Sequence, residues 1–138
     1  MIKLKSIKFR AKTIRAGKWS KWMYGSLDFT KYTYQEARIV GYDDPVQYWH
    51  KIDKNTIGQF TGQKDKNKKE IYEGDILRFS EVDTAIVEWN EKYSNFMVKP
   101  IQDYYFDSDV LGHALEYNNN VEIIGNIYDN PELLKGGI

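Results

Sequence analysis

Short segments in which apolar and polar residues alternate, separated by turn-forming residues, most constrain what this chain folds into. Residues 3–13 interleave lysine and arginine with apolar residues, and from Ile7 onward the period is close to two. That period is typical of a strand with one buried face. Aromatic residues, which are favoured in strands, make up 15% of the 138-residue chain. The sequence therefore predicts a β-rich fold.

The second half of the chain carries the clearest strand and turn patterns. Polar or glycine-containing segments at residues 63–70, 73–75 and 90–95 predict turns, and 63–70 is expected to be exposed throughout. Gly74 is expected to adopt a positive φ, and Asp75 to accept backbone hydrogen bonds within its turn. The strands predicted in this half cover residues 57–62, 76–79, 84–89, 96–99 and 121–124.

Residues 16–56 give a less regular pattern. The segment 16–18 contains a glycine and predicts a turn, after which residues 19–29 return as a strand. A strand is compatible with the aromatic and β-branched residues Tyr32, Tyr34, Ile39, Val40 and Tyr42, whereas residues 34–38 alone could form one helical turn. Proline after two aspartates predicts a tight turn at residues 43–45.

Two segments in the last third of the chain are predicted to be helical. Residues 107–117 have an apolar face at helical spacing, and Asp107 or Ser108 is a suitable N-cap. Residues 130–134 predict a capped helical turn with proline at its first position. Together with the strands, these segments predict a β-rich α+β fold. The apolar face of the longer segment consists of Val110, Leu111, Ala114 and Leu115.

The composition excludes several classes of protein. The chain has no cysteine, which excludes a disulfide framework, thiolate metal sites and cysteine nucleophiles. The start of the sequence alternates charged and apolar residues, so it is not expected to be a signal peptide. No apolar run approaches the roughly 18 residues that span a bilayer. We therefore expect a cytoplasmic protein without a membrane partner.

The net charge of zero conceals a polarised chain. Residues 1–72 contain 16 Lys/Arg and 7 Asp/Glu, a balance of +9, whereas residues 73–138 contain 4 and 13, a balance of −9. These halves can neutralise each other within one chain or between chains of an oligomer, or the basic start can be a nucleic-acid footprint. The pI of about 6.7 argues against the last interpretation, because nucleic-acid modules usually have a basic pI.

Basic and aromatic residues interleave near the start of the chain, as they do on surfaces that stack single-stranded nucleic acid. In a strand of period two, Trp19 and Lys21 share one face, while Ser20, Trp22 and Tyr24 share the other. We expect at least one of these aromatic rows to belong to the core. The candidate interaction surface comprises Lys8, Arg10, Lys12, Arg15, Lys18, Trp19, Lys21 and Trp22.

No pattern of catalytic residues is recognisable. His50 and His113 lie in unrelated contexts, and the sequence has no Gly-x-Ser-x-Gly elbow and no glycine-rich phosphate-binding motif. Asp103, Asp107 and Asp109 could supply oxygen ligands to Mg²⁺ or Ca²⁺, but they fit no complete EF-hand loop. Helix capping explains Asp107 or Asp109 equally well. We expect no enzyme activity, no cofactor and no metal site.

Six short segments of the chain are informative when they are taken together: residues 57–62, 65–76, 87–89 and 124–133, and also 9–11 and 22–25. Together they resemble the signature of the YopX family of phage and prophage proteins. At Lys68 the family usually has glycine, and a lysine at positive φ carries a steric cost, so the turn type or loop length can differ here.

The resemblance implies an α+β N-terminal part that takes part in self-association, and a C-terminal part that is an SH3-like barrel. We place these parts at residues 1–55 and 56–138. It also implies a phage or prophage protein in the cytoplasm of a bacterial host, and it brings no established activity. The sequence thus predicts a non-catalytic, homo-oligomeric interaction module that binds a protein partner. The alternative is a nucleic-acid-binding accessory protein that uses the basic N-terminal strand.

Overall fold

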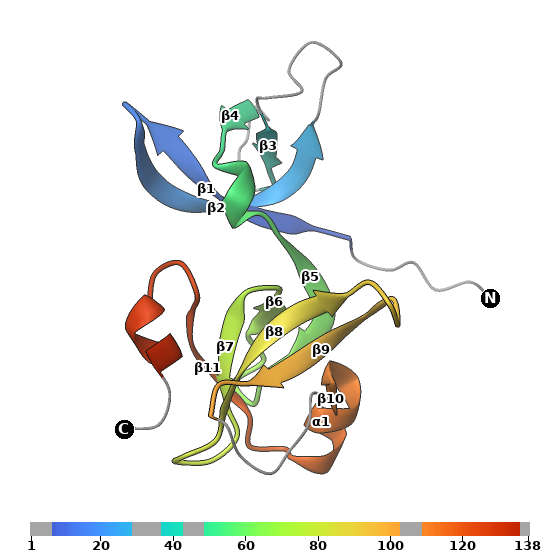
Figure 1. Cartoon of the computed structure of the whole chain (residues 1–138). Coiled ribbons are helices and arrows are strands. Elements are labelled where there is room, and N and C mark those ends of the chain that lie inside the picture. The colour runs from blue at the N-terminus through green and yellow to red at the C-terminus, as the bar shows by residue number, and fades with distance from the viewer. Residues whose placement is uncertain (1–6, 29–36, 43–48, 103–108, 136–138) are drawn as a thin grey trace, which may run out of the picture. The chain divides into compact units, whose positions relative to one another are not determined.

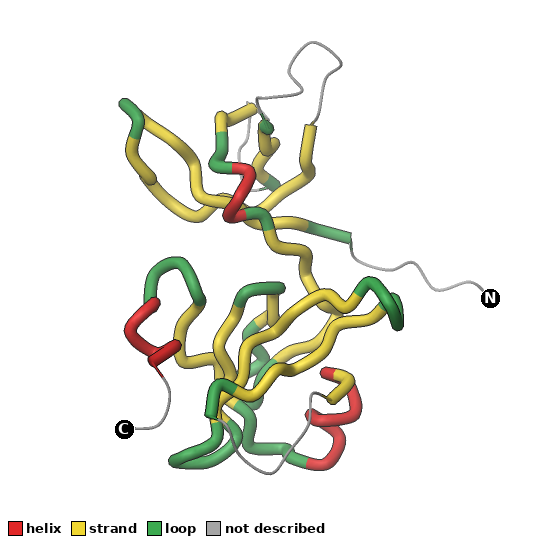
Figure 2. The backbone as a smooth tube through the Cα atoms, viewed as in Figure 1, coloured by secondary structure: helices red, strands yellow, loops and turns green. Residues whose placement is uncertain are grey.

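The computed structural model describes residues 7–28, 37–42, 49–102 and 109–135. Strands dominate these residues, with short helical segments between them (Figure 2). The chain forms two compact units, Met1–Phe60 and Thr61–Ile138. The predicted β-rich α+β class is confirmed, because the described strands form antiparallel sheets of six and five strands beside one short α-helix.

The N-terminal unit is an antiparallel sheet followed by a short 3-10 helix (Figure 1). Its strand order is β4-β3-β2-β1-β5, and β5 continues into the C-terminal unit, where its next neighbour in the sheet is β6 (Glu70–Tyr72). After β4 the chain returns to β1 through a bridge between Thr13 and Ile52 and a 2.9 Å hydrogen bond from the Asp53 amide to the Lys12 carbonyl. The elements are β1 (Phe9–Arg15), β2 (Lys18–Asp28), β3 (Arg38–Gly41), β4 (Trp49–Lys51), η1 (Lys54–Thr56) and β5 (Gly58–Lys64).

A two-residue turn connects β1 and β2. Ala16 and Gly17 have φ angles of 52° and 74°, and positive φ at both central residues is typical of the type I′ turns that join twisted hairpin strands. The predicted turn is therefore confirmed, although Lys18 is already the first residue of β2. Glycine adopts this conformation without steric cost, whereas Ala16 does not.

Small and aliphatic side chains form the core of the N-terminal unit. Gly25 allows β2 to approach β3 closely, because a Cβ atom at this position would lie 1.8 Å from the Val40 carbonyl oxygen. The fully or nearly buried core residues are Ala11, Ala37, Ile39 and Ile52, with Met23, Leu27 and Ile57 packed partly against them.

The C-terminal unit contains a five-stranded antiparallel sheet with strand order β10-β9-β8-β7-β11. β10 and β11 are its edge strands, and no closed barrel is found in the described part of the chain. The strands predicted at 76–79, 84–89, 96–99 and 121–124 are all present, with shifts at their ends. The elements are β6 (Glu70–Tyr72), β7 (Asp75–Arg78), β8 (Thr84–Asn90), β9 (Asn95–Pro100), β10 (Asp109–Val110) and β11 (Glu122–Asn126).

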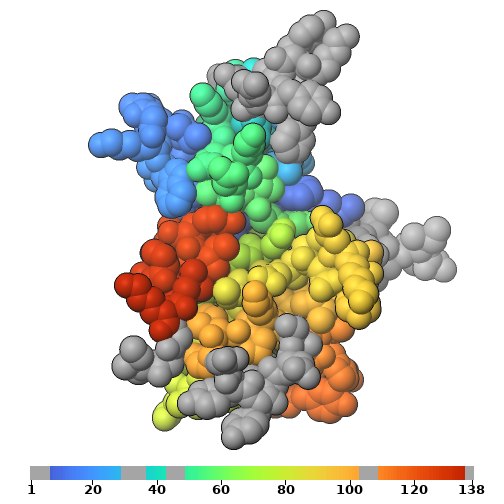
Figure 3. Space-filling view, viewed as in Figure 1, coloured from blue at the N-terminus to red at the C-terminus, as the bar shows by residue number. Residues whose placement is uncertain are grey.

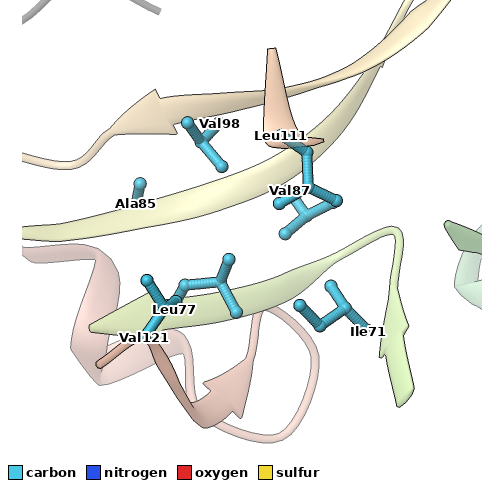
Figure 4. Packing of buried hydrophobic residues seen from close by; sticks show 7 residues of the cluster. All are labelled: Ile71, Leu77, Ala85, Val87, Val98, Leu111 and Val121. Atoms are coloured by element: carbon cyan, nitrogen blue, oxygen red, sulfur yellow. The ribbon is translucent and has the colours of Figure 1, made fainter. Parts of the chain in front are cut away.

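The core of this unit lies against the central strands of that sheet. In Figure 4 the buried side chains from several strands and the start of the helix point toward one another. Each is at most 1% exposed, which places the main hydrophobic stabilisation of the unit here. The cluster consists of Ile71, Leu77, Ala85, Val87, Val98, Leu111 and Val121.

The turn between β6 and β7 forms as the sequence predicts. Gly74 has a φ of 93°, a conformation that favours glycine. Its amide donates to the Val87 carbonyl, and its carbonyl accepts from the Ile127 amide. Asp75 is 1% exposed, and its Oδ2 accepts a 2.7 Å hydrogen bond from the Tyr72 amide.

The segment 63–70 is not the uniformly exposed turn that its composition predicts. Asp65 is only 7% exposed. Its Oδ1 accepts hydrogen bonds from the Asn67 and Lys69 amides, and its Oδ2 accepts one from the Ile123 amide. Lys68 adopts a φ of 63°, so the left-handed turn is kept although the residue is lysine. The prediction failed at Asp65 because a backbone partner 58 residues away in sequence satisfies the carboxylate.

The α-helix, α1 (Leu111–Tyr117), is shorter than the predicted segment 107–117. Its N-cap is Val110, which makes no side-chain capping bond, and the predicted caps Asp107 and Ser108 lie outside the described residues. Of the predicted apolar face, Leu111, Ala114 and Leu115 contact the core, whereas Val110 is 38% exposed in β10. The predicted C-terminal helical turn is confirmed as the 3-10 helix η2 (Pro131–Lys135).

Candidate functional site

A row of cations and aromatic rings covers one face of β1 and its neighbouring strands. The Lys8 ammonium lies 5.1 Å from the centre of the Phe60 ring, and the Arg10 guanidinium 4.6 Å from that of Trp22. The Lys12 ammonium lies 4.8 Å from Trp22 and 5.7 Å from Trp19. These distances are within the range of cation–π attraction. We call Lys8, Arg10, Lys12, Trp19, Trp22 and Phe60 the cation–aromatic surface.

Trp19 is the most firmly oriented exposed ring of this surface. Its indole Nε1 donates a 3.0 Å hydrogen bond to Asp53 Oδ2. The other Asp53 oxygen accepts from the Asn55 amide and so caps η1. The ring is nevertheless 47% exposed. An exposed aromatic side chain held at its edge by a fixed carboxylate loses little conformational freedom when another molecule covers it.

A bulge in the hairpin brings both tryptophans to the same face. Lys12 is opposite Trp22 and Ile14 is opposite Trp19, with a register shift between the two pairs. The Thr13 hydroxyl fills the irregularity, since Oγ1 accepts from the Lys21 amide and donates to the Lys21 carbonyl, both at 3.2 Å. Such a bulge redirects side chains. The prediction from strict period two, which separated Trp19 from Trp22, was therefore wrong.

The expectation that at least one aromatic row belongs to the core was also wrong. The core cluster contains no residue of either row, and among the described residues of β2 it is Met23 and Leu27 that pack against it. Trp19 and Tyr24 are 47% and 41% exposed. The apolar volume beneath the sheet is filled by alanine and isoleucine instead. The residue of β1 that is buried in this surface is a cation, since Arg10 is only 6% exposed.

The remaining predicted residues, Arg15, Lys18 and Lys21, do not join this row. Arg15 and Lys18 lie directly opposite each other beside the Ala16-Gly17 turn. All three are exposed, and the hairpin tip that carries them stands out at the surface of the N-terminal unit, in blue in Figure 3. The eight predicted residues thus divide into a stacked row and a basic tip.

The sequence did not indicate four residues that contribute to this part of the N-terminal unit. Phe60 and Asp53 come from segments that follow β4, and their contacts with β1 and β2 exist only once the sheet has formed. A further pair, Arg38 and Trp49, lies on β3 and β4 with the guanidinium 3.9 Å from the ring centre. The spacing of Arg38 and Trp49 in the sequence carries no period that would reveal their contact.

The residues considered for catalysis or metal binding are not brought together. His50 is half-buried in β4 opposite Ile39, whereas His113 is on α1 with Nδ1 3.3 Å from Asp109 Oδ1. Within residues 7–28, 37–42, 49–102 and 109–135, no three histidine or acidic side chains gather as a metal site would require. Asp103 and Asp107 lie outside those ranges. None of the helices described there is long and apolar enough to span a bilayer.

Comparisons with known proteins place this fold in a family. The structure is similar to that of protein EF1440 from Enterococcus faecalis, with a TM-score of 0.61 and 24% identity, over 95% of this chain and 99% of that one. At this identity the likeness concerns the fold. No curated protein matches the chain. The family model described as YopX protein matches residues 8–135, which include both units. The chain therefore belongs to the YopX family.

Proposed function

We propose that this protein is a non-catalytic interaction module, encoded by a phage or prophage, that self-associates through its N-terminal unit and binds a protein partner. The observation that carries the proposal is the cation–aromatic surface, with Trp19 exposed yet fixed by Asp53 and Lys12. Tryptophan, tyrosine and arginine are the residues that most often contribute large binding energies at protein interfaces. Their fixed arrangement favours a protein surface as the occupant.

The arrangement of the rings favours protein binding over stacking of nucleic-acid bases on this same face. The Trp22 ring lies close to both Arg10 and Lys12, and the Phe60 ring close to Lys8. Phe60 is only 7% exposed. Base stacking requires an open ring face for each nucleotide, and the cations of the chain itself occupy that position on Trp22. Trp19 alone does not make a platform for successive bases.

The SH3-like architecture of the C-terminal unit is likewise a proposal. It is supported by short antiparallel strands in the order β10-β9-β8-β7-β11 and by membership of the YopX family. Small barrels of this type bind peptides or nucleic acids without a fixed preference, so this unit does not by itself identify a partner. The proposed self-association therefore rests on the N-terminal unit.

Sedimentation at micromolar concentration tests self-association. The chain has a mass of 16.3 kDa, and we expect the wild type to sediment as a larger species. Trp19→Ala should shift the distribution toward the monomer, with an increase in the dissociation constant of about tenfold or more. Trp89→Ala is a matched control, because Trp89 is 44% exposed in the C-terminal unit, close to the 47% of Trp19.

Two results would contradict the proposal in different ways. A single species near 16.3 kDa for the wild type excludes self-association at this concentration. An oligomer that Trp19→Ala and Trp89→Ala weaken equally leaves self-association intact but places the interface elsewhere. Circular dichroism melts of both variants show whether each remains folded.

A further inference from the structure

We propose that the basic tip of the β1–β2 hairpin, formed by Arg15, Lys18 and Lys21, binds the phosphate backbone of duplex nucleic acid. This is a separate activity from the proposed self-association. It uses different residues: the register places Lys12 and Ile14 on one face with Trp22 and Trp19, whereas the next pair, Arg15 and Lys18, lies on the other face.

The strongest observation is the pairing of like charges at the tip. Arg15 and Lys18 are direct cross-strand partners in the hairpin. In antiparallel sheets, directly opposite residues have Cβ atoms about 5 Å apart, and like charges in this position destabilise the pair. A bound anion would remove this repulsion. The chain therefore maintains, at an exposed turn, an arrangement that is unfavourable until negative charge is supplied from outside.

No carboxylate in the described part of the chain supplies that charge. Arg15, Lys18 and Lys21 are exposed, and none of the three takes part in the ion pairs found among the described residues. The nearest acidic residue in the sequence after the tip is Asp28. Asp53, which approaches the hairpin, uses its oxygens to bind Trp19 and Asn55.

The shape of the tip fits a groove of duplex nucleic acid. β2 pairs with β3 only from Gly25 onward, and the segment 52–56 flanks β1 only as far as Thr13. Among the described residues, the end of the hairpin at residues 14–19 therefore consists of β1 and β2 alone. The result is a two-stranded ribbon whose turn residues, Ala16 and Gly17, are exposed and have little or no side chain to obstruct an approach. The major groove of B-form DNA admits a two-stranded β-ribbon, and cations at its end can then contact the phosphates on the groove walls.

Phosphate is favoured over the carboxylates of an acidic protein. The charges at the tip are three cations within seven consecutive residues, with no intervening acid. Nucleic acid presents negative charges at regular, fixed intervals, about one for each 1.7 Å of duplex axis. A protein that matched the tip would need opposed carboxylates, which repel each other as the tip cations do. The zero net charge of the whole chain limits affinity but not the local field at the tip.

Fluorescence anisotropy with a labelled random-sequence DNA duplex at about 50 mM salt tests the proposal. We expect binding whose logarithmic dependence on salt has a slope of about −2.7, the value for three phosphate contacts. The variant Arg15→Gln, Lys18→Gln, Lys21→Gln should lose at least about tenfold in affinity and most of the salt slope. The control Lys64→Gln, Lys99→Gln, Lys135→Gln removes the same charge from exposed positions of the C-terminal unit and should retain both.

Each alternative has its own outcome. Absence of binding at about 50 mM salt, or equal losses in the tip variant and the control, overturns the proposal. Displacement of the duplex by an equal charge concentration of polyglutamate also overturns it, since the tip would then recognise acidic protein. Tighter binding of the single strand than of the duplex excludes insertion of the ribbon into a groove. Duplex binding that persists in Trp19→Ala separates this activity from self-association.

Discussion

At the scale of single residues, we expect this fold to be most sensitive to substitution where a residue forms hydrogen bonds with partners distant in the sequence. Asp65 is the clearest case, because its carboxylate accepts hydrogen bonds from three backbone amides, including that of Ile123. Burial by itself raises the pKa of this carboxyl group, but the bonds from Ile123, Lys69 and Asn67 and the charge of Lys69 outweigh that effect and lower the pKa. The charged form is therefore favoured in the folded state.

We predict that Asp65→Asn lowers the free energy of unfolding by about 2 kcal/mol at neutral pH, because an amide NH₂ group would face one of the donating amides. A carboxyl group with a lowered folded-state pKa contributes stability that is present above its unfolded value of about 4 and is lost as pH falls through the folded value. The difference between variant and wild type should therefore shrink in acid. Urea denaturation at pH 7 and pH 3 measures it, with Asp83→Asn, whose carboxylate accepts from Ser80, as control. A difference that does not change with pH would contradict this account.

Gly74 combines a positive φ of 93° with a buried position. We predict that Gly74→Ala destabilises the protein by more than about 1 kcal/mol, since alanine at this φ is strained. Asp75→Asn should be milder, because the amide oxygen can still accept the hydrogen bond from Tyr72. Thermal denaturation of the two variants gives the comparison. A Gly74→Ala protein that melts at the wild-type temperature would show that this turn does not require glycine.

At the scale of elements, the turn of the β1–β2 hairpin places a non-glycine residue in a backbone conformation that favours glycine. Ala16 has a φ of 52° in the turn, and an L-residue with a Cβ atom pays a cost of roughly 1 kcal/mol there. We predict that Ala16→Asn stabilises the protein by about 0.5–1 kcal/mol, because Asn-Gly is the preferred type I′ pair. Chemical denaturation measures the change.

The matching control for the hairpin is Gly17→Ala, at a φ of 74°. This variant should destabilise the protein, since it introduces a second strained residue. No atom lies within 4 Å of the position that a Cβ of residue 17 would occupy, so the effect reports backbone conformation alone. Stabilisation by Gly17→Ala would mean that the hairpin uses another turn type.

At the scale of the whole molecule, the charge separation follows the two units. Residues 1–60 contain 12 Lys/Arg and 5 Asp/Glu, a balance of +7, and residues 61–138 contain 8 and 15, a balance of −7. If copies of the chain associate as proposed, this polarity should steer their encounter. We predict that the association rate falls about tenfold between about 50 and 500 mM salt, while the dissociation rate changes little. Stopped-flow light scattering measures both rates, and a salt-independent association rate would contradict electrostatic steering.

Much of the local structure could be predicted from the sequence. The strands of the C-terminal half, the hairpin turn at Ala16-Gly17, and the Gly74-Asp75 turn all follow from side-chain period and from the backbone freedom of glycine. These properties are local, since they depend on residues within a few positions of one another. The YopX signature was visible for the same reason, because it is made of such turns and short strands.

The grouping of the candidate residues was decided by the tertiary structure. A single Thr13 side chain bonded to Lys21 shifts the register and brings Trp19 to the face of Trp22, which no period-two pattern can indicate. Trp19 is oriented by a hydrogen bond to Asp53, which lies 34 residues away in the sequence. The carboxylate of Asp65 accepts a hydrogen bond from the amide of Ile123, 58 residues away. The sequence alone thus determined where most strands and turns form. It also determined that the two halves of the chain differ in charge. Which face each aromatic side chain occupies depended on long-range pairing, because a hydrogen bond between distant segments leaves no trace in the spacing of either one.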